Sequence, residues 1–64
     1  MKRTVIRINA EDFMAWWNIG PLVFRAVHRY LADEARKEGK KVRLTKGHVT
    51  EAEMAWVDEK FQNF

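Results

Sequence analysis

The sequence predicts an all-α fold, with a short, a long and a short helix in that order after an extended N-terminal arm. The long helix is indicated by its two ends: Pro21 suits a first helical position, Gly39 suits the residue just past a helix, and no breaker lies between them. The two short helices are indicated by Asn9 and Thr50, good N-cap residues that are each followed three positions later by an acidic side chain. We therefore predict a three-helix domain.

Length and composition limit what such a domain can do. The 64 residues make one domain, spanning 1–64, with the arm over 1–8 and the three-helix core over 9–62. A chain of this size buries only about 60% of its unfolded surface and keeps a net stability of about 3–5 kcal/mol. It contains no cysteine, which excludes disulfides, thiolate zinc sites and cysteine-ligated iron–sulfur clusters. We expect a protein that is not an enzyme, with no cofactor, no metal site and no small-molecule substrate.

The charge pattern indicates a cytoplasmic protein. The net charge of +3 favours an acidic partner without identifying one. The longest stretch without charge runs from Phe13 to Phe24, which is shorter than the ~20 apolar residues of a membrane span. Glu11 and Asp12 precede it, whereas a signal peptide would have basic residues there. We expect no membrane association.

The arm has the composition of a short strand. Residues 3–8 are rich in β-branched side chains and alternate, so that Thr4, Ile6 and Ile8 lie on one face and Arg3, Val5 and Arg7 on the other. Such a strand needs a partner. The segment 41–44 could be a brief extended piece, and residues 5–7 are the only other strand-like segment with which it could pair.

The boundaries of the helices follow from their caps. The first helix is expected over Ala10 to Trp17, and the second over Pro21 to Glu38, with Arg29 and Asp33 placed for an i, i+4 ion pair. The third has two candidate starts. Thr45 could cap it early, but Thr50 and Glu53 make a proper capping box and start it at Glu51. The predicted apolar faces are Phe24, Val27, Leu31 and Ala35 on the second helix and Met54, Val57, Phe61 and Phe64 on the third.

Two groups of side chains are candidates for binding a partner. Trp16 and Trp17 are adjacent, so on a helix they point about 100° apart. One is expected in the core and the other half exposed; the alternative is a docking patch, because tryptophan is enriched at binding hot spots. Arg25, His28 and Arg29 share a side of the second helix and could meet phosphate or carboxylate groups, although a solvated, salt-bridged face is the simpler interpretation.

The order of motifs from the second helix onward resembles a known family. The matching residues are Ile19-Gly20-Pro21-Leu22-Val23-Phe24-Arg25, Arg29, Leu31, Glu34-Ala35-Arg36, Gly39, Leu44-Thr45, Val49 and Ala52. This pattern resembles the small C-terminal domain of the B subunit of light-independent protochlorophyllide reductase. The resemblance implies an accessory helical module that packs against a larger redox enzyme or stands alone. It implies a protein partner and carries over no catalytic residue.

The first residues resemble a second family. The stretch Lys2-Arg3-Thr4-Val5-Ile6-Arg7-Ile8-Asn9-Ala10-Glu11-Asp12-Phe13 is similar to the opening of a ribbon-helix-helix repressor. In that fold a basic strand pairs with its twin in a dimer, and its outward residues enter the major groove. The resemblance implies DNA contacts by Arg3, Val5 and Arg7. We keep a dimeric DNA-binding repressor as the alternative to a protein-binding module.

Overall fold

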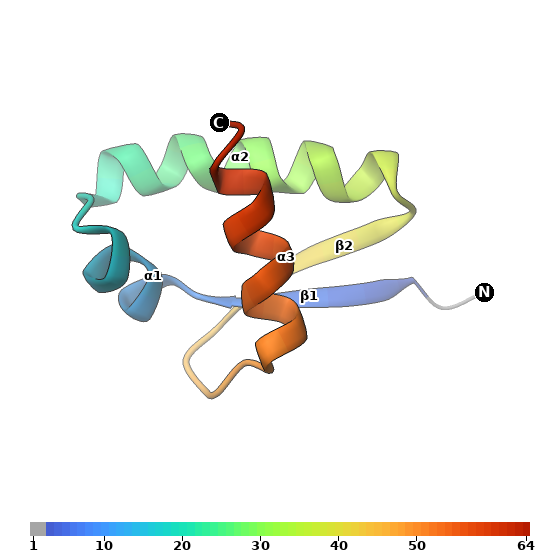
Figure 1. The fold of residues 1–64 in the computed structure, drawn as a ribbon, viewed down its shortest axis with the longest axis horizontal. Coiled ribbons are helices and arrows are strands. Elements are labelled where there is room, and N and C mark those ends of the chain that lie inside the picture. Colours follow the sequence, from blue (N-terminus) through green and yellow to red (C-terminus); the bar gives the residue numbers. More distant parts are fainter. Residues whose placement is uncertain (1–2) are drawn as a thin grey trace.

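The chain folds into five elements, seen here in a computed structural model that describes residues 3–64 (Figure 1). In chain order they are β1 (Thr4–Asn9), α1 (Ala10–Trp17), α2 (Pro21–Lys37), β2 (Lys40–Thr45) and α3 (Glu51–Phe61). The all-α prediction is wrong, because β1 and β2 form a two-stranded parallel sheet and the fold is α/β. Met1 and Lys2, at the start of the expected arm, lie outside the described residues.

The non-local pairing of the two strands explains why the sequence pattern predicted an all-α fold. The two strands pair in parallel from Thr4 opposite Lys40 to Asn9 opposite Thr45. Parallel pairing requires a long crossover connection, and α1 and α2 together provide it. The pairing is therefore non-local. The possible pairing of residues 41–44 with residues 5–7 is confirmed. The expected arm is in fact half of the sheet, and its inward residues Ile6 and Ile8 are buried.

The three predicted helices are present, and their caps are those expected. The Asn9 side chain accepts a hydrogen bond from the backbone N–H of Asp12 at 3.1 Å, and Thr50 and Glu53 form the capping box that starts α3. Pro21 is the first residue of α2. This helix ends at Lys37, one residue earlier than predicted, and Gly39 follows with a φ of 71°. A positive φ suits glycine because it has no Cβ to clash.

One hydrophobic core joins all three helices to the sheet. In Figure 1, α2 lies along one side of the strands and α3 crosses in front of them. The predicted buried face of α2 is confirmed, whereas on α3 the prediction fails for Met54 and Phe64, which are 47% and 57% exposed. Among residues 3–64, no helix is long and apolar enough to cross a membrane. The core consists of Ile6, Ile8, Phe13, Phe24, Val27, Leu31 and Val57.

Candidate functional site

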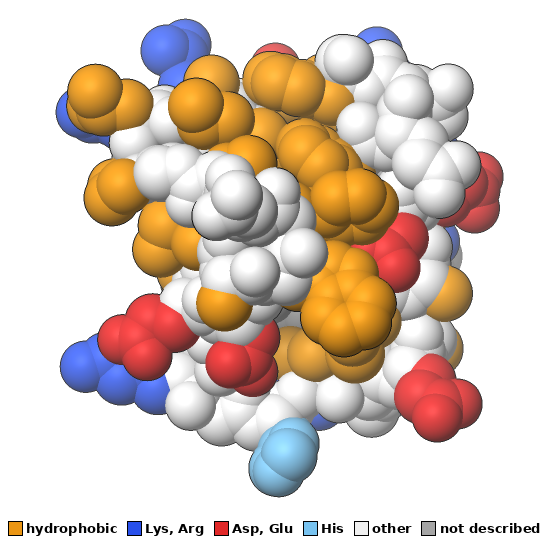
Figure 2. Space-filling view, turned by 60° about the vertical axis from the view of Figure 1, so that its left-hand side comes forward, with side chains coloured by type: hydrophobic (Ala, Val, Ile, Leu, Met, Phe, Trp, Pro, Cys, Tyr) orange, Lys and Arg blue, Asp and Glu red, His pale blue; other side chains and the backbone are white. Residues whose placement is uncertain are grey.

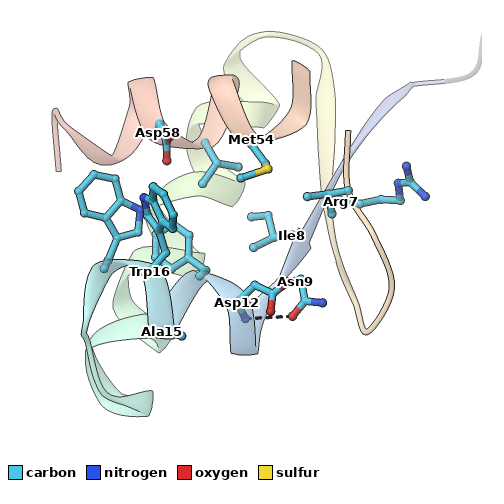
Figure 3. A pocket seen from close by; sticks show the side chains of 12 residues that line it. Arg7, Ile8, Asn9, Asp12, Ala15, Trp16, Met54 and Asp58 are labelled. Atoms are coloured by element: carbon cyan, nitrogen blue, oxygen red, sulfur yellow. Dashed lines mark hydrogen bonds between the residues drawn. The ribbon is translucent and has the colours of Figure 1, made fainter. Parts of the chain in front are cut away.

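A groove of about 440 Å³ opens between α1 and α3, above the C-terminal end of β1 (Figure 3). Ile8, at the end of β1, and Met54, on α3, lie in its middle, and Trp16 and Asp58 lie toward one end (Figure 3). Its lining is mostly apolar, and its volume is in the range of ordinary binding sites. The lining residues are Arg7, Ile8, Asn9, Asp12, Phe13, Ala15, Trp16, Trp17, Val49, Met54, Val57 and Asp58.

The two adjacent tryptophans divide between core and surface. Trp17 is partly buried and packs edge-on against Phe61, with ring centroids 4.8 Å apart. Trp16 points away from the core and is 74% exposed at the groove. The expectation that only one of the pair enters the core is confirmed. Trp16, however, is more exposed than the half-exposed side chain we expected, so a large aromatic surface faces solvent.

The α3 wall of the groove is fixed to β1 through Glu53. This carboxylate is 8% exposed and accepts hydrogen bonds from the Arg7 backbone N–H at 2.7 Å and from the Arg7 guanidinium at 3.0 Å. It also accepts from the backbone N–H and the hydroxyl of Thr50, both at 2.9 Å. The Arg7 guanidinium holds the pKa of Glu53 well below its usual range, and Glu53 raises the pKa of Arg7 in turn. The wall is therefore held by charge-assisted bonds.

The polar groups of the groove are mainly acidic. Asp12 stands at the start of α1 and Asp58 on α3, so the two carboxylates come from opposite walls (Figure 3). Among the described residues, no ion pair involves either of them. Within residues 3–64, Arg7 is the one cation in the lining, and its guanidinium already binds both oxygens of Glu53.

The predicted basic group on α2 does not belong to this groove. Arg25, His28 and Arg29 are absent from its lining, so the structure does not bring them together with the tryptophans. His28 is partly buried, and its ring stacks on Phe24 with centroids 6.2 Å apart. The predicted ion pair of Arg29 is also wrong, because Asp33 pairs with Arg36 one helical turn later. A shorter i, i+3 spacing is equally able to join two side chains.

The outward face of the sheet carries the residues predicted to contact DNA. Val5 and Arg7 are exposed there, as expected, and Arg3 precedes them at the edge of β1. The register places Lys41 opposite Val5 and Arg43 opposite Arg7, so β2 adds two exposed cations to the same face. In a ribbon-helix-helix dimer the N-terminal strand pairs with the same strand of a second chain. Here β1 pairs with β2 of its own chain.

A second polar cluster has a structural role at the far end of α2. The Glu38 carboxylate accepts hydrogen bonds from the Trp56 indole N–H at 3.0 Å and from Lys40 at 3.1 Å, and it forms an ion pair with Lys60 at 2.5 Å. These donors lower the pKa of Glu38 to about 2. The cluster joins the end of α2 to β2 and α3, and it orients Trp56 against the core.

Comparison with family models, with curated proteins and with solved structures gives no match for this chain. The resemblances to the protochlorophyllide reductase domain and to ribbon-helix-helix repressors therefore stay predictions. The case for a function depends on the groove and on the sheet surface.

Two residues of the groove lining, Met54 and Asp58, and Glu53, which fixes its α3 wall, were not identified as functional in the sequence. Met54 was predicted to lie on the buried face of α3, but it is 47% exposed at the groove. Glu53 was identified as a cap, but its second bond, to β1, depends on the fold. Asp58 carried a signal that could have been read: it is an acid near the C-terminus of a helix, where the helix dipole disfavours negative charge.

Proposed function

We propose that this chain is a non-catalytic protein-binding module that holds an apolar segment of its partner in the groove between α1 and α3. The observation that supports this most directly is Trp16, which is 74% exposed beside an apolar groove. Tryptophan is among the residues that contribute most to binding energy at protein interfaces. A partner that covers Trp16 removes its apolar surface from water at about 25 cal/mol per Å².

The surroundings of Trp16 support the same proposal. Figure 2 shows hydrophobic side chains gathered in a broad band over the face that contains the start of α2. Large exposed apolar side chains occur on α2 and α3 as well, at Leu22, Val23 and Met54. A contiguous exposed apolar patch marks an interaction surface more often than isolated hydrophobic residues do.

The proposal is tested by selection of peptides from a phage-displayed library of random 12-residue sequences on the folded chain. Selected peptides should bind Trp16→Ala at least about 10-fold more weakly, the loss expected of an interface hot spot. The matched control is Leu44→Ala on β2, which removes an apolar side chain that is 47% exposed and lies outside the groove lining. Recovery of no binding peptide, or equal losses in both variants, would contradict the proposal.

The accessory role implied by the resemblance to the protochlorophyllide reductase domain fits a module of this kind. In that role the partner is a larger protein, and the chain itself contributes a binding surface and no chemistry. The cytoplasmic location expected from the sequence remains a prediction.

DNA binding by the outward sheet face is a second candidate, favoured by one observation. The exposed outward face carries Lys41 and Arg43, and among the described residues neither of them forms an ion pair. Arg7 lies on the same face, but its guanidinium already binds Glu53. A two-stranded ribbon fits the major groove of DNA.

Binding of a DNA duplex should weaken as the salt concentration rises. Lys41→Ala and Arg43→Ala should each reduce the slope of log K against log salt concentration by about 0.9. Arg25→Ala, on the exposed side of α2, is the control and should leave the slope unchanged. Duplex binding that does not depend on salt, or a slope that Lys41→Ala and Arg43→Ala leave unchanged, would contradict binding by this surface.

A further inference from the structure

We propose that the segment held in the groove carries a lysine or arginine beside its apolar anchor, that Asp58 binds this cation, and that Asp12 on the opposite wall adds to the negative charge that attracts it. The inference rests on the proposed function and specifies its partner. It commits to a basic, apolar polypeptide segment, in preference to a second copy of this chain, an acidic peptide or a purely apolar one.

The charge of the groove is the first argument. The lining contains two carboxylates, Asp12 and Asp58, and one guanidinium, Arg7. Because Arg7 already binds both oxygens of Glu53, its charge is neutralised within the fold. An incoming cation therefore meets two carboxylates without a competing cation from the lining. The whole chain has a net charge of +3, so an acidic groove runs against its average composition.

The position of Asp58 is the second argument. It lies in the last turn of α3, where the negative end of the helix dipole disfavours a carboxylate. Its helix neighbours at three and four residues are Ala55, Met54, Phe61 and Gln62, none of which is a cation. Asp58 is also partly buried against the groove. Among the described residues, none forms an ion pair with Asp58. We therefore expect its carboxylate to pair with a cation of the bound segment.

Trp16 and the size of α1 complete the description of the occupant. Trp16 and Asp58 lie toward the same end of the groove in Figure 3, and an exposed indole attracts lysine and arginine by cation–π interaction. Helix α1 has eight residues and is about 12 Å long, so the α1 wall of the groove is only two helical turns long. One large apolar side chain and one adjacent cation fill such a site. A long amphipathic helix would extend beyond it.

The experiment uses the same phage-displayed peptide library, selected in parallel on wild-type chain and on the double variant Asp12→Asn, Asp58→Asn. Wild-type selections should be enriched in peptides with lysine or arginine within four residues of a large apolar residue. The double variant should select apolar residues without that cation. The change to asparagine keeps size and hydrogen bonding, and an unchanged circular dichroism spectrum checks the fold.

Affinity measurements on one selected peptide then isolate the charge pair. Replacement of its lysine by glutamine should weaken binding to the wild-type chain by about 2- to 5-fold, as expected for an exposed ion pair, and should have little effect on binding to the double variant. Glu59→Gln is the control, because Glu59 adjoins Asp58 on α3 but is absent from the groove lining. It should leave the lysine preference unchanged.

The outcomes separate this inference from the function on which it rests. Peptides that need Trp16 but show no cation preference, or that prefer acids, overturn the inference and leave the binding module in place. Selection of no peptide overturns both. If light scattering shows a dimer that Trp16→Ala converts to a monomer, a second copy occupies the groove and the inference is wrong.

Discussion

Glu53 shows how much of this small structure depends on one side chain. It caps α3 through Thr50 and at the same time receives the outward-facing backbone N–H of Arg7 on β1. An edge strand with free backbone groups invites pairing with other chains, and a buried carboxylate placed on that edge blocks it. The same contact sets the distance between β1 and α3, and hence the floor and one wall of the groove.

Glu53→Gln should lower the free energy of unfolding at neutral pH by about 1.5–3 kcal/mol. The amide removes the charge and turns N–H donors toward the Arg7 donors, so charge-assisted bonds at a buried site are lost. Chemical unfolding followed by circular dichroism measures the difference. Glu51→Gln, an exposed acid in the first turn of the same helix, is the control. Equal stability of the Glu53 variant and wild type would contradict the role assigned to this carboxylate.

The same carboxylate should govern stability in acid. The pKa of Glu53 is lower in the folded chain than its ordinary value of 4.5, and that of Glu38 is lowered to about 2. Below pH 4.5 the unfolded chain therefore binds more protons than the folded chain, and the free energy of unfolding falls as the pH falls. Stability should be level above about pH 5.5 and decline from pH 4.5 toward 2 and below. In Glu53→Gln the decline should be shallower, because Glu38 is then the remaining carboxylate with a lowered pKa. Urea titrations at several pH values measure the free energy of unfolding, and an equal dependence on pH in the variant and the wild type would contradict this.

At the scale of the elements, the α2–β2 junction depends on backbone geometry. Gly39 has a φ of 71°, and a Cβ placed on it would meet nothing within 4 Å. Gly39→Ala should therefore cost about 1–2 kcal/mol from backbone conformation alone. Gly47→Ala is the matched control, because its Cβ makes only an ordinary contact with Thr45 and its φ is not positive. Thermal unfolding that lowers the Tm equally in both variants would contradict this explanation of the turn.

The helices could be predicted because their signals are local. Asn9, Pro21 and Thr50 act within one turn of the backbone that they cap, so their positions in the sequence suffice. The sheet could not be predicted with the same certainty, because its two strands meet only after α1 and α2 have packed. The alternation of Ile6 and Ile8 with Val5 and Arg7 did predict which side of β1 is buried.

The site was predicted only in part, for a related reason. Trp16 could be identified as a candidate because two adjacent tryptophans can both be buried only on a helix that is covered on two sides. The opposite wall comes from α3, some forty residues later in the chain, and neither the Arg7–Glu53 contact nor the exposure of Met54 follows from local pattern. Arg25 and Arg29 were candidates on charge alone, and charge does not determine which surface is concave.

For the whole molecule, the single core predicts cooperative unfolding with little reserve. Buried side chains from β1, α1, α2 and α3 form one cluster. If any of these elements unfolds, part of the cluster is therefore exposed to solvent. Far-UV circular dichroism and tryptophan fluorescence should therefore report the same transition. Leu31 is fully buried on α2, and Leu31→Ala should cost about 2–5 kcal/mol, comparable with the roughly 3–5 kcal/mol available to a domain of this size.

That variant should consequently be largely unfolded, or close to it, at 25 °C, whereas Ala26→Gly on the exposed side of the same helix should remain folded with a loss of about 1 kcal/mol. The comparison separates the loss of core packing from the loss of helix propensity, since both changes lie in α2. If Leu31→Ala instead unfolds in two separate steps, with fluorescence changing before circular dichroism, the tryptophan-bearing helices form a unit that is independent of α2. The groove between α1 and α3 would then be able to open without unfolding of the whole chain.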